Sequence, residues 1–427
     1  MSPVIDATAV LASDAALPAR DRLLDDESMR TLFAEVLAEQ GAMRIDRVVR
    51  MRGKYRPGES LRVLFRVWSG ARSWLVSGRM RAAGTETLYR EALTRAVACP
   101  PLRAVVHVPA MRTVFWTFPN DRRIEPHTTA GIAAHAVRAA GVVDPTVELA
   151  GYAPERALVY RVGQRGSGEA TAFVKAYAPG DGVAAGRTLR TLADGIAAAG
   201  VDLVIPRVLG VDGDVLVIEA MRGRHLHALE PGEHADAFVA LGRAVGALHL
   251  LPSTALPAAD PFGAPAIGEA VRVLSAIRPD VGTAVNRLGA ELDTRRPAGR
   301  ARAVIHGDLN SRNWLACDAR VALFDLDQAS VGDPAIDLGG VLAWMRARTL
   351  TGAWSADRER TLVSALYAGY GSVRPLPPPA VLGWHRAAAL LVERGVRAIT
   401  RLRRDQLARL PAILDHARRA LREVERA

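Results

Sequence analysis

The fold of this chain is decided by Val304-Ile305-His306-Gly307-Asp308-Leu309-Asn310-Ser311-Arg312-Asn313-Trp314-Leu315 and, a few residues later, Leu323-Phe324-Asp325-Leu326-Asp327. Short apolar runs at 303–305 and 321–325 predict two β-strands that open onto polar residues. A tight loop would carry Asp308 and Asn313, and a short hairpin would bring Asp325 opposite them. An HxD or a DxD alone has little specificity, but four polar residues in this order at apolar strand ends form a specific pattern.

These residue types suit phosphoryl transfer. The reaction needs a carboxylate that orients the attacking hydroxyl and accepts its proton, and oxygen ligands that hold Mg²⁺ against the phosphates. Asp308, Asn313 and Asp325 supply oxygens of this kind. The pattern therefore predicts a site at which a phosphoryl group is transferred to a hydroxyl.

The block H-G-D-x-x-x-x-N, followed by an apolar strand and Asp, resembles the signature of the aminoglycoside phosphotransferase and choline kinase family. The resemblance covers about residues 147–370 and implies a kinase-like fold that uses ATP and Mg²⁺. It implies that Asp308 is the catalytic carboxylate, that Asn313 completes the catalytic loop and binds the metal, and that His306 braces the loop. Asp325 would also bind the metal, with Asp327 assisting.

Two further carboxylates follow this block. By the same resemblance, Asp337 would accept hydrogen bonds from the backbone of the catalytic loop. Asp333 stands before Pro334, and this order is typical of a residue that caps a helix with proline in its first turn. We therefore expect Asp333 to cap a helix that starts near Ala335.

Lysine is rare in this chain, since Lys54 and Lys175 are the only two and arginine supplies every other strong base. A lysine that persists in such a sequence is a candidate for a role that a guanidinium cannot fill. Lys175 lies on an expected strand, 171–177, where the family places the lysine that contacts the α- and β-phosphates. For Lys54 a solvated surface charge is the better interpretation.

The segment that follows resembles the family's adenine-binding hinge, with Glu219 and Met221 as the residues that would bind the nucleotide. Family members usually pair the phosphate-binding lysine with a glutamate on a helix. The helix expected at 184–198 contains Asp194 as its only acid, so either Asp194 substitutes for the glutamate or the pairing is absent.

The N-terminal half of the chain contains two similar strand-rich segments. In the first, strands are expected at 60–68, 73–80, 105–108 and 113–118 and a helix at 85–97; in the second, strands at 157–162, 171–177, 206–209 and 215–219 surround the helix at 184–198. This order predicts a duplicated five-stranded unit, with two unrelated β-rich units as the alternative. The repeat aligns Ser77 with Lys175, so a duplicated first copy would lack the phosphate-binding lysine.

The C-terminal half is expected to be helical, with only 303–305 and 321–325 as strands. Helices are expected at 233–250, 267–274, 281–292, 339–348 and 358–367, followed by a long arginine-rich stretch from residue 379. The predicted fold is α+β: a bilobal kinase-like fold with an additional β-rich N-terminal domain. Its domains would be a strand-rich cap at 1–130, a nucleotide-binding N-lobe at 131–225 and a helical C-lobe at 226–427.

Composition excludes several classes of protein. No apolar run approaches the roughly 18 to 20 residues of a membrane span, and residues 1–20 lack a basic segment typical of a signal peptide. Cys99 and Cys317 are isolated, which argues against disulfides and structural zinc. The net charge of +11 is spread along the chain without a dense basic tract, which argues against nucleic acid as a partner. We expect a cytoplasmic protein.

Other activities fit the residues less well. A phosphatase of the haloacid dehalogenase type would need a later lysine, which is absent after Lys175. A DxD glycosyltransferase leaves His306 and Asn313 unexplained. A protein kinase would carry H-R-D, D-F-G and A-P-E motifs, whereas Gly307 replaces the arginine here. A kinase that modifies Ser or Thr in peptides and a nucleotide-binding pseudokinase scaffold remain as alternatives.

The charge of the C-terminal stretch bears on the phosphate acceptor. Residues 384–426 hold eleven arginines against five carboxylates, whereas a polycationic aminoglycoside would need a cluster of carboxylates. A neutral or anionic acceptor is favoured by this surplus. The sequence thus predicts an ATP- and Mg²⁺-dependent phosphotransferase that acts on a small-molecule hydroxyl of a sugar, cyclitol or amino sugar.

Overall fold

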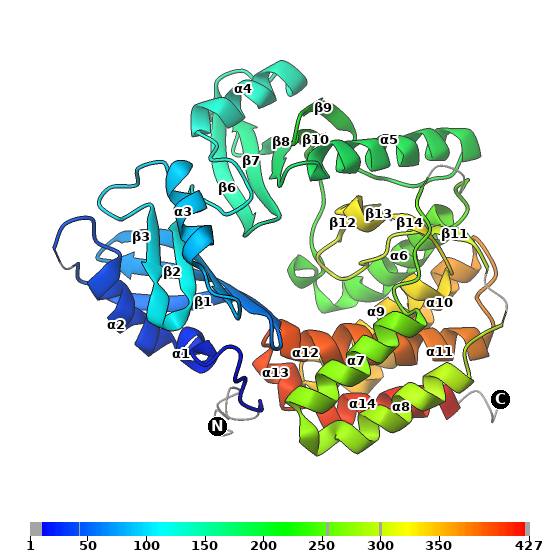
Figure 1. Ribbon diagram of the computed structural model, residues 1–427. Coiled ribbons are helices and arrows are strands. Elements are labelled where there is room, and N and C mark those ends of the chain that lie inside the picture. The colour runs from blue at the N-terminus through cyan, green and yellow to red at the C-terminus, as the bar shows by residue number, and fades with distance from the viewer. Residues whose placement is uncertain (1–10, 42, 253–255, 299–300, 423–427) are drawn as a thin grey trace. The chain divides into compact units, whose positions relative to one another are not determined.

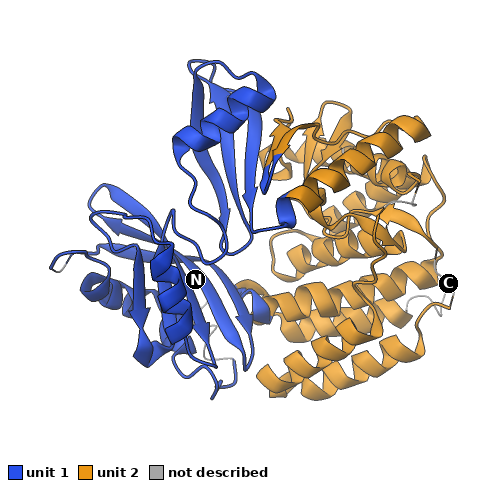
Figure 2. Ribbon diagram, turned by 45° about the horizontal axis from the view of Figure 1, so that its top comes forward, with its two compact units in different colours: residues 1–182, 212–215, 399–404 blue, residues 183–211, 216–398, 405–427 orange. Residues whose placement is uncertain are grey.

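The computed structural model describes residues 11–41, 43–252, 256–298 and 301–422 (Figure 1). The chain divides into two compact units, which Figure 2 distinguishes by colour. Unit 1 comprises residues 1–182, 212–215 and 399–404, and unit 2 comprises 183–211, 216–398 and 405–427. Unit 1 is rich in strands and unit 2 in helices, as a kinase-like fold requires.

The first sheet has five strands in the order β1-β2-β3-β5-β4. They are β1 (Arg47–Arg56), β2 (Ser60–Ser69), β3 (Arg72–Arg81), β4 (Val105–Val108) and β5 (Thr113–Thr117), with α3 (Glu86–Thr94) between β3 and β4. One face of this sheet is apolar and packs on α1 (Arg20–Leu24) and α2 (Asp26–Val36). There the ring of Phe33 contacts those of Phe65 and Phe115 edge to face, with centroids 5.4 and 5.1 Å apart.

The second sheet repeats this topology, because its order is β6-β7-β8-β10-β9. Its elements are β6 (Pro145–Ala153), β7 (Ala157–Gln164), β8 (Ala170–Tyr177), α5 (Asp181–Ala199), β9 (Val208–Asp212) and β10 (Val215–Glu219). A bulge interrupts the first strand of each sheet, between Arg50 and Arg52 and between Leu149 and Gly151. Aligning the bulges places Ser77 at the position of Lys175, since Ser77 pairs with Leu64 and Lys175 with Val159. Matching order and bulges support a duplicated origin of the two sheets.

Unit 2 contains most of the helices. They include α6 (His234–Leu248), α7 (Ala264–Ile277), α8 (Gly282–Thr294), α9 (Ala335–Leu350), α10 (Ala356–Gly371), α11 (Pro379–Ala389), α12 (Val396–Thr400), α13 (Arg404–Leu407) and α14 (Leu410–Arg422). Helices α6 and α10 pack with their backbones in close contact, which requires glycine at two positions. A Cβ at Gly242 would overlap the carbonyl of Leu366, and one at Gly369 would overlap that of Val239. This close approach positions the elements that support the site.

Three features differ from the sequence-based expectation. The described residues of the C-terminal half form four strands rather than two. Strand β12 (Trp314–Cys317) pairs with β13 (Arg320–Leu323), and β14 (Ser330–Gly332) pairs with β11 (Ala303–Ile305). Strands of three or four residues are too short to show an alternation. Helix α4 (Thr129–Ala140) is also additional, although Thr128 caps its start and Gly141 ends it with a φ of 64°. The stretch from residue 379 is broken by a π-helical segment, Leu390–Gly395.

Candidate active site

The loop between β11 and β12 carries His306, Asp308 and Asn313. It turns sharply at Gly307, whose φ of 79° is strained for any residue with a side chain. A Cβ at this position would lie 2.7 Å from the carbonyl oxygen of Gln328. The turn therefore requires glycine, which explains why this loop cannot carry the arginine of an H-R-D motif.

Asp337 holds the backbone of this loop in place, as expected. Its carboxylate accepts hydrogen bonds from the backbone N–H of His306 at 2.7 Å and of Gly307 at 3.0 Å. His249, at the end of α6, lies 3.1 Å from the same carboxylate through Nε2 and 3.0 Å from the hydroxyl of Tyr370 through Nδ1. A buried network thus ties the loop to three helices, and sequence reasoning missed His249 and Tyr370.

The buried network fixes the charge of Asp337. Burial by itself would raise the pKa of this carboxyl, but hydrogen bonds and charge from His249 and the backbone N–H of His306 outweigh it and lower the pKa below the usual value. Asp337 is therefore a carboxylate at neutral pH. An anionic acceptor holds the two backbone donors more strongly than a neutral one.

His306 and Asp333 make the structural contacts that the sequence predicts. Nε2 of His306 lies 3.1 Å from the carbonyl oxygen of Phe324, and its Nδ1 lies 3.4 Å from the backbone nitrogen of Asp308. His306 thereby links the 306–313 loop to the segment that follows β13. Asp333 accepts a 2.9 Å hydrogen bond from the backbone N–H of Ala335, the first residue of α9.

The hairpin β12–β13 brings the other candidate residues to the same loop. The side-chain amide of Asn313 donates a 2.8 Å hydrogen bond to the carbonyl of Asp308. The backbone of Phe324 donates to the carbonyl of Asn313 at 3.0 Å. Asp325 follows with a left-handed φ of 58°, and Asp327 lies in the next helical turn. Asp308, Asn313 and the segment with Asp325 and Asp327 are thus assembled within unit 2.

Arg397 contacts the carboxylate of Asp308, which sequence reasoning did not anticipate. Its Nη1 donates a 3.1 Å hydrogen bond to Oδ1 of Asp308, and its Nη2 lies 3.9 Å from Glu393. Burial alone would lower the pKa of Arg397, but the charges of Glu393 and Asp308 raise it. Arg397 is the second residue after the π-helical segment, a feature often found at functional sites. The pair leaves Oδ2 of Asp308 without a hydrogen bond from the described residues.

The residues expected to bind nucleotide lie on the second sheet and just after it. Lys175 is on β8, with its Nζ 5.3 Å from the ring centroid of Tyr177. Glu219 ends β10 and lies 3.7 Å from Nε of Arg207. The segment beyond Met221 is tied to β12, because Arg224 and Ala316 exchange two backbone hydrogen bonds of 2.9 Å.

The described residues contain neither a metal cluster of the usual kind nor a membrane-spanning helix. In residues 11–41, 43–252, 256–298 and 301–422, no group of three or more His, Cys, Asp and Glu side chains is arranged to hold a metal. The candidate magnesium ligands are a different set, two carboxylates and an amide. None of the helices in these ranges has the length and apolar character needed to cross a bilayer.

Comparison with known proteins identifies the family. Residues 154–376, more than half of the chain, match the model of the phosphotransferase enzyme family. The chain belongs to this family. Membership confirms the resemblance to aminoglycoside phosphotransferases and choline kinases and supports transfer of a phosphoryl group to a small molecule. No functionally curated protein matches the sequence.

Solved structures resemble the chain as well. Amicoumacin kinase hAmiN, in complex with AMP-PNP, Ca²⁺ and Ami, is 15% identical with a TM-score of 0.50, over 68% of this chain and 93% of that one. This similarity shows the kinase-like fold. An aminoglycoside-3'-phosphotransferase of type VIII is 27% identical, with a TM-score of 0.43 over 59% of this chain and 96% of that one. A choline/ethanolamine kinase family protein from Mesorhizobium loti is 18% identical, with a TM-score of 0.45 over 69% and 97%.

Proposed function

We propose that this phosphotransferase moves the γ-phosphate of ATP to a hydroxyl of a small molecule, a sugar, cyclitol or amino sugar, with Asp308 as the catalytic base. The observation that carries the proposal is the anchoring of the 306–313 loop. Asp337 holds its backbone at His306 and Gly307, and Asn313 holds the carbonyl of Asp308. A carboxylate fixed in this way can orient an acceptor hydroxyl and accept its proton with little reorganisation.

The donor set fits Mg²⁺. The amide of Asn313 donates through Nδ2 to Asp308, so its Oδ1 is the atom that would serve as a ligand. Asp325 and Asp327 would add the anionic oxygens that a hard cation prefers. The metal would neutralise charge on the phosphates of ATP. The amicoumacin kinase hAmiN binds AMP-PNP and Ca²⁺, and we propose the corresponding pair, ATP and Mg²⁺, with Lys175, Glu219 and Met221 at the nucleotide.

Arg397 favours a neutral or anionic acceptor. Its guanidinium contacts Oδ1 of Asp308, which directs an incoming hydroxyl to Oδ2. A polycationic acceptor would place positive charge beside this guanidinium, and like charges repel at such distances. The pair therefore supports sugars and cyclitols ahead of aminoglycosides, in agreement with the arginine surplus of residues 384–426.

The domain roles follow from this assignment. Residues 131–225 would form the nucleotide-binding N-lobe and residues 226–427 the C-lobe with the acceptor site. Residues 1–130 would be a cap without a nucleotide site of its own, because Ser77 stands where the second sheet has Lys175. A pseudokinase scaffold accounts less well for a complete set of catalytic residues, and a peptide Ser or Thr kinase is the second candidate.

A phosphate-transfer screen of the full chain tests the proposal. Purified protein would be incubated with [γ-³²P]ATP and Mg²⁺ against panels of sugars, cyclitols, aminoglycosides, nucleosides and Ser- or Thr-containing peptides. We expect turnover with a sugar or cyclitol that is lost in Asp308→Asn. Transfer to peptides alone, or transfer that survives in Asp308→Asn, contradicts the proposal.

A further inference from the structure

One face of the first sheet carries an unusual number of cations. In antiparallel pairs, directly opposite residues project from the same face. Arg62 lies opposite Lys54 on β1 and opposite Arg79 on β3. Two residues earlier on β2, Ser60 lies opposite Arg56 and Arg81. The register therefore gathers five basic residues on the face that does not pack against α1 and α2.

A single buried carboxylate serves three of the arginines around this face. Oε2 of Glu155, in the turn between β6 and β7, lies 3.2 Å from Arg62, 3.3 Å from Arg79 and 2.9 Å from Arg122. Burial would raise the pKa of Glu155, but the three guanidinium groups lower it. Asp121 is a second buried carboxylate that acts on Arg62. Two negative charges thus face the three guanidinium groups, and with Arg81 an excess of positive charge remains on this face.

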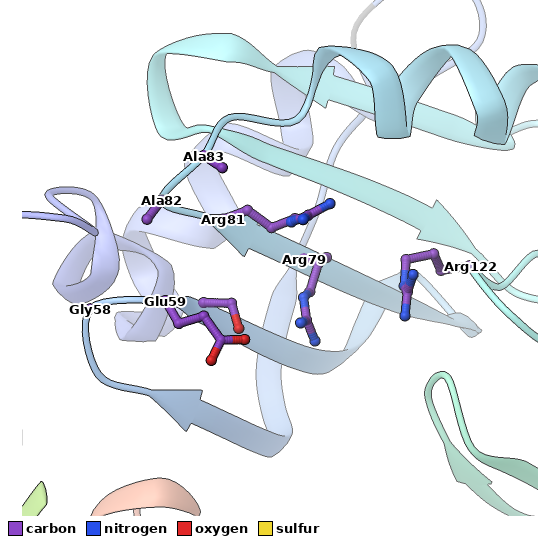
Figure 3. A pocket seen from close by; sticks show the side chains of 8 residues that line it. Gly58, Glu59, Arg79, Arg81, Ala82, Ala83 and Arg122 are labelled. Atoms are coloured by element: carbon purple, nitrogen blue, oxygen red, sulfur yellow. The ribbon is translucent and has the colours of Figure 1, made fainter.

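A cavity of about 340 Å³ opens at this excess of charge. It is lined by Gly58, Glu59, Ser60, Arg79, Arg81, Ala82, Ala83 and Arg122. Figure 3 shows that Arg79 and Arg81 come from one strand, and that Glu59 and Arg122 lie on either side of Arg79. The volume lies at the lower end of the range for small-molecule sites, about 300 to 1,000 Å³.

Two polar atoms of the cavity lining lack a hydrogen bond. Ser60 is 2% exposed, and its hydroxyl has no partner among the described residues. The same holds for Nε of Arg122, although another nitrogen of this guanidinium contacts Glu155. A buried donor without a partner is costly. A ligand with acceptor oxygens would satisfy both groups.

We propose that this cavity binds the phosphate group of a small phosphorylated molecule. Arg81 and Arg122 would hold the phosphate oxygens, with the Ser60 hydroxyl as a further donor. More than one free positive charge favours a dianion over a monocarboxylate, and guanidinium groups bind phosphate bidentately. Glu59 at the rim would accept hydrogen bonds from hydroxyl groups of the ligand, as in a sugar phosphate.

The second sheet explains why this site would differ from a nucleotide site. The hydroxyl of Tyr152 on β6 donates a 2.7 Å hydrogen bond to Asp121 and lies 3.3 Å from Oγ of Ser77. Ser77 stands in the first sheet where Lys175 stands in the second. The end of β6, with Tyr152, therefore covers the part of the first sheet that corresponds to the lysine position. The open part of the face lies further along β3, at Arg79 and Arg81. The site is therefore independent of the proposed catalytic centre in unit 2.

Calorimetry on the full chain tests this site. Inorganic phosphate and glucose 1-phosphate would be titrated separately at constant ionic strength into wild type, Arg81→Gln and Ser60→Ala. Arg72→Gln is the matched control, because Arg72 is an exposed arginine of the same strand that does not line the cavity. We expect glucose 1-phosphate to bind, with a Kd raised about tenfold or more in Arg81→Gln, from loss of a charge-assisted hydrogen bond, and unchanged in Arg72→Gln.

Ser60→Ala separates binding from a merely structural role. Because the variant removes a buried hydroxyl without a partner, we expect the Tm of the unliganded protein to stay equal or rise while the affinity for glucose 1-phosphate falls. Tighter binding of glucose 1-phosphate than of inorganic phosphate would support an organic phosphate as ligand. Absence of binding at 10 mM, binding of inorganic phosphate alone, or equal affinity in Arg81→Gln and Arg72→Gln would overturn the proposal.

Discussion

Nη1 of Arg397 and Oδ1 of Asp308 form a 3.1 Å ion pair at the edge of the candidate active site. Both side chains are more than one-third exposed, so solvent weakens their attraction. The contact therefore serves orientation more than stability. It fixes one oxygen of the carboxylate and leaves Oδ2 for the acceptor hydroxyl that we propose.

Arg397→Gln should impair turnover without unfolding the protein. The glutamine cannot make the ion pair, so the Asp308 carboxylate loses its orientation; kcat should fall about tenfold, the effect of one charge-assisted hydrogen bond. Steady-state kinetics on the acceptor found in the screen measure the change, and the affinity for MgATP should stay the same. The control is Arg272→Gln, an exposed arginine on α7 that pairs with Glu269. Equal losses of kcat in the two variants would refute the orienting role.

Asp308→Asn should abolish phosphoryl transfer and leave MgATP binding near that of wild type. The amide is similar in shape but cannot accept the hydroxyl proton, and general-base catalysis commonly contributes about 10²- to 10⁴-fold. Single-turnover assays and calorimetry with MgATP separate the two effects. Turnover at the wild-type rate would exclude Asp308 as the base.

Asp325→Ala should have the complementary effect. Removal of an anionic oxygen takes a ligand from Mg²⁺, so the affinity for MgATP should fall, while the affinity for ATP in EDTA should change little. Calorimetry with and without the metal measures the difference. If the two titrations of the variant match those of wild type, Asp325 is not a metal ligand.

Asp337→Asn should destabilise unit 2. The carboxylate accepts hydrogen bonds from His306, Gly307 and His249. In the asparagine variant one oxygen becomes an amide nitrogen, which cannot accept a hydrogen bond. Breaking a buried charged network typically costs about 3 to 5 kcal/mol, measured as the free energy of unfolding in urea. Glu269→Gln, at an exposed pair on α7, is the control.

The pH dependence of stability gives a second readout of Asp337. Its pKa is lowered in the folded state, so the unfolded chain takes up the proton first as the pH falls. Its stabilising contribution is complete above the unfolded pKa of about 3.9 and is lost as the pH falls through the folded value. Wild type should therefore lose stability more steeply than Asp337→Asn below about pH 4. Parallel curves would show that Asp337 is not held as an anion.

The sequence was sufficient to predict the loop of His306, Asp308 and Asn313, because their spacing is local and specific. It also predicted the contact of Asp337 with this loop, through the family resemblance. The partners that it missed are distant in sequence: Arg397 lies 89 residues from Asp308, and His249 lies 88 residues from Asp337. Residues 384–426 contain eleven arginines, and their sequence does not distinguish Arg397 from the others. The packing of the helices after the π-helical segment is what places Arg397 beside Asp308.

Lys54 is not the ordinary surface charge that the sequence suggested. Burial and the like charges of Arg62, Arg401, Arg56 and Arg156 instead lower its pKa to about 8. The unfolded chain keeps the proton up to the ordinary lysine pKa of about 10.4. Below about pH 8 the lysine is therefore charged in both states and destabilises the fold, and the penalty is relieved as the pH rises above 8.

Lys54→Met tests this directly, because the methionine keeps much of the apolar stem and removes the charge. We expect the variant to be more stable than wild type at pH 7, and we expect the difference to shrink as the pH is raised toward 10. Urea unfolding at several pH values measures it, with Arg72→Gln as the control for the loss of one positive charge at an exposed site. A difference that does not depend on pH would show that Lys54 keeps an ordinary pKa and that positive charge on this face is already compensated.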